Sequence, residues 1–308
     1  MYSACKGVFG IIGLPYCGST IVSYVLGSHS QVYCGADLYK LSPNYDAGCS
    51  LHGEDCKLWT PENKNLVYES LKTSQTEYYH RICQITSKSI ICDASKTPSY
   101  FYSRVPDIKI PVVLINLRKH PLRHICSLLF NHHFVKDLQI RGDNEIMNYL
   151  KSRWDEARSF IDKSLIRISE HSQKTNDLRQ KLSDRDWLEI SYESFVENPR
   201  ETTSGIIRHL DLKYEQGQTK FENHDLHPIV GNTGPRRKVT KPKSPVNSKS
   251  DLRASFYDSE KSSIQMDEKY LLVFNQKQIA EIIRIPEYQK LCHDLSYPLN
   301  PRGDFDEI

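Results

Sequence analysis

Short apolar runs alternate along the chain with longer stretches in which apolar residues recur at helical spacing. The runs at 7–13, 89–93 and 110–117 are rich in β-branched residues and are typical of buried strands. Segment 186–195 predicts a further strand that leads into a helix. Because buried strands that alternate with helices form parallel sheets covered on both faces, the pattern predicts a three-layer α/β fold with a central, mostly parallel sheet.

The helices are predicted from apolar residues spaced three and four apart. Segment 19–28 places Val22 and Val25 on one face, and the segment after Pro121 repeats this spacing. The strongest amphipathic pattern covers 145–171. Further helices are expected near 63–86, from Pro199 onward, near 267–283 and near 286–295.

Two polar segments interrupt this order. A loop-rich insertion is expected at about 34–62, and residues 235–263, which are basic and then serine-rich, predict a long loop. The chain shows no internal repeat, and its 308 residues can bury a sizeable core. We therefore expect residues 1–308 to form one domain.

Composition excludes several classes of function. The net charge of +3 is too small to indicate a nucleic-acid partner. The longest apolar runs are far shorter than the ~20 residues that a transmembrane helix needs. The first ten residues lack the pattern of a secretory signal. Nine scattered cysteines, an odd number without a C-x-x-C pair, favour reduced thiols and a cytoplasmic location.

One region does gather potential metal ligands. Cys34, Cys49, His52 and Cys56 lie within 23 consecutive residues. A zinc site is one interpretation, but cysteines packed in a core or loop are the favoured one, and no metal is expected.

The stretch 13–20, GLPYCGST, has the frame of a phosphate-binding P-loop but lacks its lysine. A strand, a glycine loop and a helix in succession form an anion site, because backbone N–H groups and the positive helix end point at the anion. Strand 110–117 is followed by Arg118 and Lys119, where a P-loop NTPase would carry the acid that holds magnesium. These features argue against hydrolysis of a magnesium-bound nucleotide.

Four stretches, taken in order along the chain, resemble the sulfotransferases that use 3′-phosphoadenosine 5′-phosphosulfate (PAPS), with a layout closest to the tyrosylprotein and carbohydrate members. They are GLPYCGSTIVSYVLGSHSQVYCGADLY, LRKHPLRHICS, ISYESFVENPRETTSGIIRHLDL and HPIVGNTGPRR. The resemblance implies that the first stretch holds the phosphosulfate end through Pro15, Tyr16, Cys17, Gly18, Ser19 and Thr20.

The same resemblance implies the other nucleotide contacts. Arg118 or Lys119, together with Ser127, would hold the 3′-phosphate, and the motif allows either cation. Tyr192 would lie near the nucleotide. The late loop would close over the 3′-phosphate and adenine through Gly231, Asn232, Arg236 and Arg237.

Sulfuryl transfer needs in-line placement, a base for the acceptor, and positive charge on the leaving phosphate. Lys96 at a strand end is the candidate cation near the leaving phosphate. The resemblance places the base at Asp37, which would deprotonate the acceptor from the other side. The family usually has a basic residue at the positions of Tyr16 and Tyr39, so this chain departs from the pattern there.

The predicted function is transfer of the sulfuryl group of PAPS to a hydroxyl or amine acceptor by direct in-line displacement, which releases adenosine 3′,5′-bisphosphate and uses no metal. A degenerate P-loop nucleotide kinase is an alternative, and Asp93 would be its metal-holding acid. A nucleotide-binding protein that has lost activity is another, and Tyr16 allows it. The basic stretch 235–249 is interpreted as a loop without a nucleic-acid role. Neither the acceptor nor the oligomeric state follows from these motifs.

Overall fold

The described chain folds around a parallel β-sheet. The computed structural model describes residues 4–131, 152–183, 186–230 and 264–302. In these residues the sheet has five strands in the order β2-β3-β1-β4-β5, and every neighbouring pair is parallel. The strands are β1 (Gly7–Ile12), β2 (Val32–Ala36), β3 (Ile90–Lys96), β4 (Val112–Arg118) and β5 (Trp187–Ser191). The α/β prediction is confirmed.

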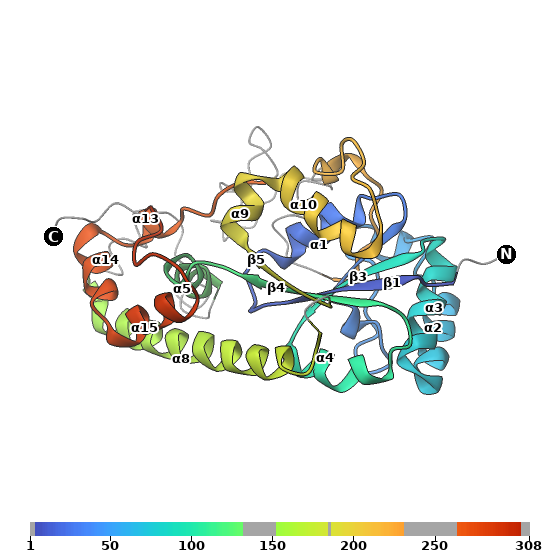
Figure 1. Ribbon diagram of the computed structural model, residues 1–308, viewed down its shortest axis with the longest axis horizontal. Helices are drawn as coiled ribbons and strands as arrows, with labels where there is room; N and C mark the ends of the chain where they lie inside the picture. Colours follow the sequence, from blue (N-terminus) through green and yellow to red (C-terminus); the bar gives the residue numbers. More distant parts are fainter. Residues whose placement is uncertain (1–3, 132–151, 184–185, 231–263, 303–308) are drawn as a thin grey trace.

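Helices cover both faces of the sheet (Figure 1). One face is covered by α1 (Ser19–Gly27), α9 (Tyr192–Glu197) and α10 (Pro199–Ile207), and the other by α2 (Pro61–Thr73), α3 (Gln75–Thr86), α4 (Pro98–Arg104) and α8 (Trp154–Arg179). Side chains alternate between the faces along each strand. Phe9 of β1 therefore joins a core with Val22 of α1, whereas Ile12 packs with Phe101 of α4 and Leu178 of α8.

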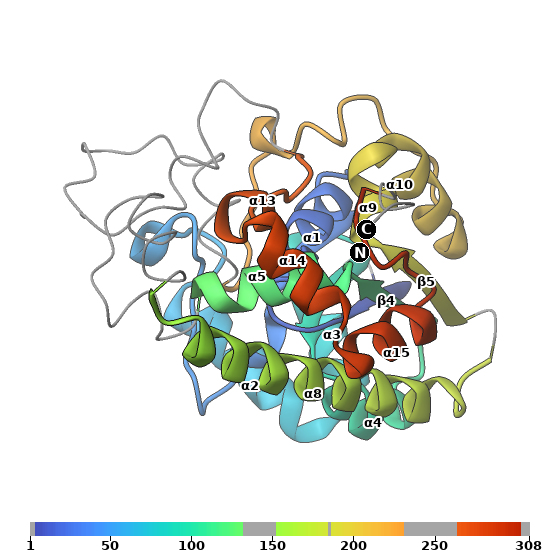
Figure 2. The same cartoon turned by 90° about the vertical axis from the view of Figure 1, so that its left-hand side faces the viewer.

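A second apolar core lies at one end of the molecule. Here α5 (Pro121–Asn131), α13 (Tyr270–Val273), α14 (Gln276–Ile283) and α15 (Pro286–Asp294) pack with α8 (Figure 2). Asn275 and Gln278 begin α14 with a capping box. The longest helix, α8, spans 26 residues and has a charged outer face. None of the helices in the described segments is long and apolar enough to cross a membrane.

The structure changes three of the predicted boundaries. The first residues of the predicted insertion 34–62 belong to strand β2, so the irregular part of the insertion begins after Ala36. The helical stretch 63–86 is two helices, because Ser74 is extended and its side chain caps α3. The long amphipathic helix, predicted to end at residue 171, continues to Arg179. Residues 145–151 of its predicted range lie outside the described residues, and so does the predicted long loop 235–263.

Candidate active site

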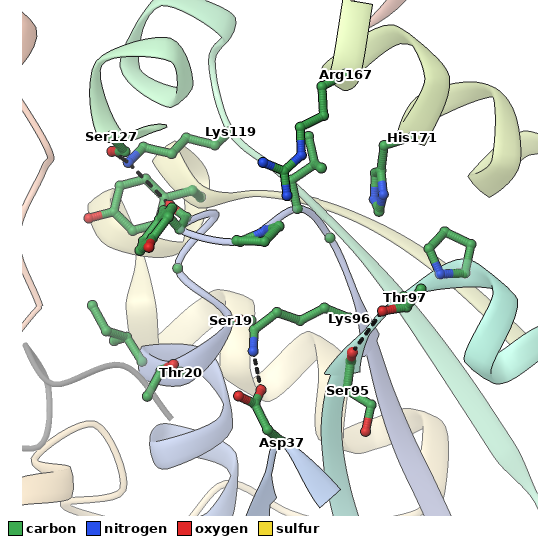
Figure 3. Close-up of a pocket in the computed structure, with 18 of the residues that line it drawn as sticks. Ser19, Thr20, Asp37, Ser95, Lys96, Thr97, Lys119, Ser127, Arg167 and His171 are labelled. Carbon is green, nitrogen blue, oxygen red and sulfur yellow. Dashed lines mark hydrogen bonds and ion pairs between the residues drawn. The ribbon is translucent and has the colours of Figure 1, made fainter. Parts of the chain in front are cut away.

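A cleft of about 740 Å³ opens at the carboxyl ends of the strands (Figure 3). Its walls are the loop after β1, the chain after β2 and β3, the start of α5 and one face of α8. Ligands of open α/β sheets bind at this edge, where connections leave the sheet toward opposite faces. The volume is typical of sites for small molecules and cofactors.

The glycine loop 13–20 packs closely against Tyr192, which also lines the cleft. Gly18, the N-cap of α1, has φ of 101°, which favours glycine. A Cβ atom there would lie 2.5 Å from the ring of Tyr192, so this close approach also requires glycine. Ser19 and Thr20 begin α1 and line the cleft. The positive end of the α1 dipole therefore opens on the cleft.

The side chains of His124 and Lys119 contact backbone carbonyl groups of this loop. Nε2 of His124 is 2.9 Å from the carbonyl oxygen of Pro15, and Nζ of Lys119 is 3.5 Å from that of Tyr16. Burial lowers the pKa of His124 to about 3, so the ring is neutral near pH 7 and donates through Nε2–H. His124 was not expected from the sequence. Its position one turn into the helix after LRKHP is the signal that could have found it.

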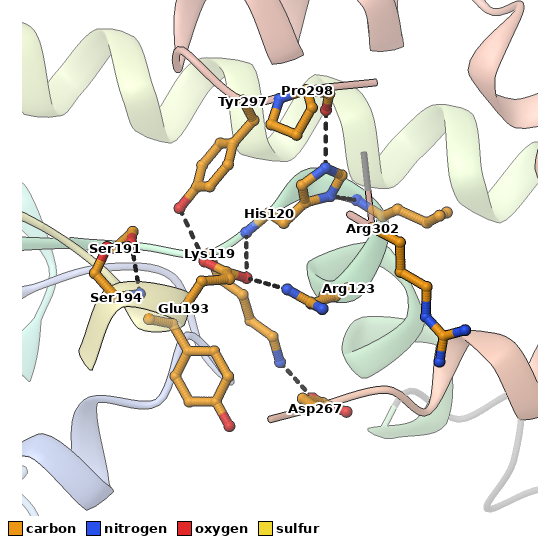
Figure 4. A network of polar contacts seen from close by, with 12 residues as sticks. Lys119, His120, Arg123, Ser191, Glu193, Ser194, Asp267, Tyr297, Pro298 and Arg302 are labelled. Atoms are coloured by element: carbon orange, nitrogen blue, oxygen red, sulfur yellow. Dashed lines mark hydrogen bonds and ion pairs between the residues drawn. The ribbon is translucent and has the colours of Figure 1, made fainter. Parts of the chain in front are cut away.

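An anion-binding cluster lies beside the loop. Nζ of Lys119 is 2.9 Å from Oγ of Ser127, and Ser127 Oγ donates to Oδ2 of Asp267 across 2.9 Å. Lys119 also forms an ion pair with Asp267 (Figure 4), and Lys269 approaches the same oxygen at 3.3 Å. Burial alone would raise the pKa of Asp267, but the two lysines and Ser127 hold it well below its usual value. The cluster thus holds a buried carboxylate.

Arg118 faces away from this cluster. Its Nε lies 3.1 Å from Oε2 of Glu189 on β5, and one terminal nitrogen is 3.4 Å from the carbonyl oxygen of Leu295. Successive residues at a strand end point in opposite directions, so only one of Arg118 and Lys119 can face the cleft. The structure places Lys119 there.

Tyr192 and Glu193 are the first two residues of α9, and their side chains make separate sets of contacts. The hydroxyl of Tyr192 donates to the carbonyl oxygen of Gln265 at 2.6 Å, and its ring lies 5.0 Å from Nζ of Lys119. Glu193 accepts hydrogen bonds from the backbone N–H of His120, from Arg123 and from Tyr297 at 3.1–3.4 Å (Figure 4). This network ties the end of β4 to α9 and to the C-terminal segment.

Asp37 and Lys96 stand at the ends of the neighbouring strands β2 and β3. Their side chains form an ion pair inside the cleft (Figure 3). Lys40 approaches the other carboxylate oxygen of Asp37 at 3.5 Å. Lys96 has φ of 68°, a conformation that non-glycine residues rarely adopt. The sequence places Asp37 and Lys96 on opposite sides of an acceptor, whereas in the structure they are in direct contact.

Asp93 lies outside the cleft. It is fully buried on β3, where the hydroxyls of Tyr79 and Tyr100 donate to Oδ2 at 2.9 and 3.2 Å. Burial raises its pKa to about 6. A carboxylate enclosed in this way does not present a metal ligand to the cleft, so the kinase alternative is not favoured.

Helix α8 contributes cleft residues that the sequence did not reveal. Arg167 and His171, one turn apart, point toward the cleft (Figure 3). Burial lowers the pKa of His171 to about 4, and among the described residues its buried Nε2 has no hydrogen-bond partner. The available signal was a run of polar residues at helical spacing, Arg167, Glu170, His171 and Lys174, on a second face of the amphipathic helix.

The predicted site residues fall into three groups. Those that line the cleft are Pro15, Tyr16, Gly18, Ser19, Thr20, Asp37, Lys96, Lys119, Ser127 and Tyr192. Those that do not are Arg118 and Cys17, whose side chain is buried beneath Gly13. Those outside the described residues are Gly231, Asn232, Arg236 and Arg237. Val230, the last described residue before them, lines the cleft.

A model described as the sulfotransferase family matches residues 9–216, which is more than half of the chain. The chain therefore belongs to the sulfotransferase family, which is a family of transferases. A search of curated protein sequences gives no significant match.

One solved structure supports the fold. The sulfotransferase domain of the olefin synthase from Synechococcus PCC 7002 is similar over 97% of both chains, with 15% identity and a TM-score of 0.50. The sulfotransferase domain from the curacin biosynthetic pathway is matched over 97% of this chain and 100% of its own, with 18% identity and a TM-score of 0.49. At these identities the likeness concerns the fold alone.

Proposed function

We propose that the protein transfers the sulfuryl group of PAPS to a hydroxyl or amine acceptor. The observation that carries the proposal is the buried cluster in which Lys119, Ser127 and Lys269 hold the carboxylate of Asp267. Two cations and a hydroxyl donor around one anion suit a 3′-phosphate, which carries two negative charges and accepts charge-assisted hydrogen bonds. The family motif assigns the 3′-phosphate to Ser127 and to either Arg118 or Lys119, and of these two cations Lys119 lines the cleft.

The donor nucleotide would span two anion sites. The start of α1, with Gly18, Ser19 and Thr20, would receive the phosphosulfate through backbone N–H groups and the helix dipole. The Lys119 cluster would receive the 3′-phosphate in place of the Asp267 carboxylate. Residues Gly231, Asn232, Arg236 and Arg237 would complete the nucleotide site from the chain after Val230.

The transfer itself would be a direct in-line displacement. The acceptor oxygen or nitrogen attacks sulfur while the bond from sulfur to the 5′-phosphate oxygen breaks, and adenosine 3′,5′-bisphosphate leaves. Asp37 would take the acceptor proton, and Lys96 would stabilise the charge that grows on the leaving phosphate. The ion pair between Asp37 and Lys96 links these roles. When the phosphosulfate draws Lys96 away, the Asp37 carboxylate becomes available as a base.

His171 is a second candidate for the base. It is neutral near pH 7, because burial lowers its pKa to about 4, and it lines the cleft on α8. Asp37 lies at the strand end where the family motif places the catalytic carboxylate, whereas His171 lies outside the four motif stretches. We therefore assign the base to Asp37. Asp37→Asn and His171→Gln separate the two assignments by turnover.

A nucleotide-binding protein without transferase activity is the alternative that two observations favour. Tyr16 replaces a basic residue of the family motif, and Lys96 is paired with Asp37 rather than facing open space. Such a protein would bind adenosine 3′,5′-bisphosphate and leave PAPS intact.

Two linked experiments test the proposal. A thermal-shift screen should show stabilisation by adenosine 3′,5′-bisphosphate that exceeds stabilisation by ADP, ATP, GTP or adenosine 5′-monophosphate, because ligands that bind the native state raise the melting temperature. PAPS labelled in the sulfuryl group should then label a fraction of pooled metabolites and proteins in a Lys96-dependent way. Binding without label transfer would favour the inactive alternative. Equal stabilisation by the nucleotides that lack a 3′-phosphate would refute the proposed donor.

A further inference from the structure

A second cluster of reactive side chains lies apart from the cleft lining. Cys49, His52 and Cys56 come from the segment after β2, and His227 comes from the chain after α10. One ligand atom from each of the four residues lies within 4.8 Å of the other three. Both cysteines are buried, and the histidines are half-buried.

Two contacts between the candidate ligand atoms have lengths close to those expected around a zinc ion. Sγ of Cys49 is 3.3 Å from Nδ1 of His52, and Sγ of Cys56 is 3.3 Å from Nδ1 of His227. Zinc binds sulfur at about 2.3 Å and histidine nitrogen at about 2.0–2.1 Å, so the edges of its tetrahedron are roughly 3.3–3.8 Å. The two sulfur–nitrogen contacts lie at this scale. The two imidazole rings also lie side by side, with centroids 4.4 Å apart.

A carboxylate orients both imidazole rings. Oδ1 of Asp225 lies 3.4 Å from Nε2 of His52, and Oδ2 lies 3.3 Å from Nε2 of His227. A carboxylate at Nε2 holds a proton there and leaves the Nδ1 lone pair for a metal. Metal-binding histidines usually have such a partner on their second nitrogen.

The backbone of His227 is fixed as well. Its carbonyl oxygen accepts hydrogen bonds from the hydroxyl of Tyr33 at 2.8 Å and from Nε1 of Trp59 at 3.1 Å. These contacts come from β2 and from the chain just before α2. The fourth ligand is therefore held in place by the same region that supplies the other three.

We propose that Cys49, His52, Cys56 and His227 bind one Zn²⁺ ion. Two thiolates and two imidazoles in a tetrahedron favour zinc among the common metals. Four protein ligands fill the coordination shell, so the site is structural. The sequence pattern C-x-x-H-x-x-x-C contains three of the ligands, and the fourth is 171 residues beyond Cys56.

The metal would tie together two segments that support the cleft. Ile229, two residues after His227, bridges to Ala36 and to Cys49, and its carbonyl oxygen accepts from the backbone N–H of Asp37. Ser50 donates through its N–H to the carbonyl oxygen of Pro228 and through its hydroxyl to that of Val230. Zinc would therefore hold in place the turn that carries Asp37 and the segment that ends at Val230. This role does not depend on sulfuryl transfer.

Elemental analysis of the purified chain tests the proposal. We expect about one zinc per chain, and the Cys49→Ser and His227→Gln variants should lose it. Cys292→Ser and His224→Gln are matched controls, because these residues lie outside the cluster and should leave the zinc content unchanged. After removal of zinc with a chelator, Co²⁺ should give the intense d–d and sulfur charge-transfer bands of tetrahedral thiolate coordination.

Asp225→Asn keeps the test decisive if the ligand variants do not fold. Asp225 is largely exposed, with 79% of its side chain accessible, so its substitution should spare the fold. Loss of its carboxylate should weaken zinc binding about 10- to 100-fold in competition with a chromophoric chelator. Zinc-free protein that takes up no Co²⁺, with Cys49 and Cys56 either joined in a disulfide or titrating as two free thiols, would overturn the proposal.

Discussion

Lys119 and Asp267 form a buried ion pair beside the glycine loop, although they lie 148 residues apart in the chain. Ser127 and Lys269 hold the same carboxylate. A buried lysine requires an anion, because an uncompensated charge in the interior is strongly destabilising. In the structure, Asp267 provides that anion. The proposed 3′-phosphate would compete with it for the same cations.

Asp267→Asn should therefore strengthen binding of adenosine 3′,5′-bisphosphate. The substitution removes the carboxylate that competes with the phosphate for Lys119 and Lys269, and we expect the dissociation constant to fall by about tenfold or more, the value of one charged hydrogen bond. Affinity for adenosine 5′-monophosphate should change little. Titration calorimetry measures both.

Glu268→Gln is the matched control for this prediction. It removes the same charge from the next residue, whose side chain pairs with Arg302. If both variants strengthen binding equally, the effect is general electrostatics and Asp267 does not occupy the phosphate position.

The pair formed by Asp37 and Lys96 predicts a kinetic pattern. Lys96→Ala should lower turnover by about 10²-fold or more, the scale of one lost transition-state donor, while nucleotide affinity falls much less. Asp37→Asn should behave in the same way. Lys40→Ala should lower turnover less than tenfold, since Lys40 approaches only the second oxygen of Asp37. Turnover of labelled PAPS with the acceptor found in the screen measures this, and near-normal turnover in Lys96→Ala would move the catalytic cation elsewhere.

Gly18→Ala should disrupt the glycine loop. The left-handed backbone costs a non-glycine residue about 1–2 kcal/mol, and the new Cβ would lie 2.5 Å from the ring of Tyr192. We expect lower stability in urea unfolding and loss of nucleotide binding. Gly48→Ala serves as the control, because a Cβ at Gly48 meets nothing within 4 Å. Retention of nucleotide affinity in Gly18→Ala would show that the loop does not carry the phosphosulfate.

His124 predicts how stability depends on pH. Burial lowers its pKa to about 3 in the folded protein, compared with about 6.5 for an unperturbed histidine. The stabilising contribution is therefore present above pH 6.5 and is lost as the pH falls toward 3. Each pH unit in that range removes about 1.4 kcal/mol, so about 2 kcal/mol should be lost between pH 6.5 and pH 5.

The variant His124→Gln isolates this effect. Glutamine can still donate to the carbonyl oxygen of Pro15, but it does not titrate, so urea unfolding should show a shallower loss of stability with acid than in the native chain. His209→Gln, at an exposed position, should leave the slope unchanged. Parallel pH profiles for the native chain and His124→Gln would contradict the neutral, buried assignment.

The fold was largely predictable because β1 and β4 are nearly continuous apolar runs and because β3 and β5 begin with apolar residues. Strand β2 was not predicted, because VYCGA is short and contains a glycine, and it is recognisable mainly by its pairing with β3. Lys119 could not be separated from Arg118 by sequence, because the choice depends on the pairing of Arg118 with Glu189 of β5.

The parts of the site that sequence did not reveal come from distant segments. Asp267 carries no local motif, and the stretch HPIVGNTGPRR that begins with His227 does not indicate a metal ligand. Each of the two residues gains its role from residues more than 100 positions away. His171 lies on an amphipathic helix whose apolar face dominates the sequence pattern. Tertiary contact, rather than local spacing, defines these residues.

The most direct test of the donor assignment is calorimetric titration of the native chain and Lys119→Ala with adenosine 3′,5′-bisphosphate and adenosine 5′-monophosphate. These four dissociation constants isolate the interaction between the 3′-phosphate and Lys119. We predict that the native chain prefers the bisphosphate by about tenfold or more and that Lys119→Ala loses at least about tenfold of this preference, as expected for one charged contact. An equal preference in the two proteins, or none in the native chain, would contradict the assignment of this cleft to PAPS.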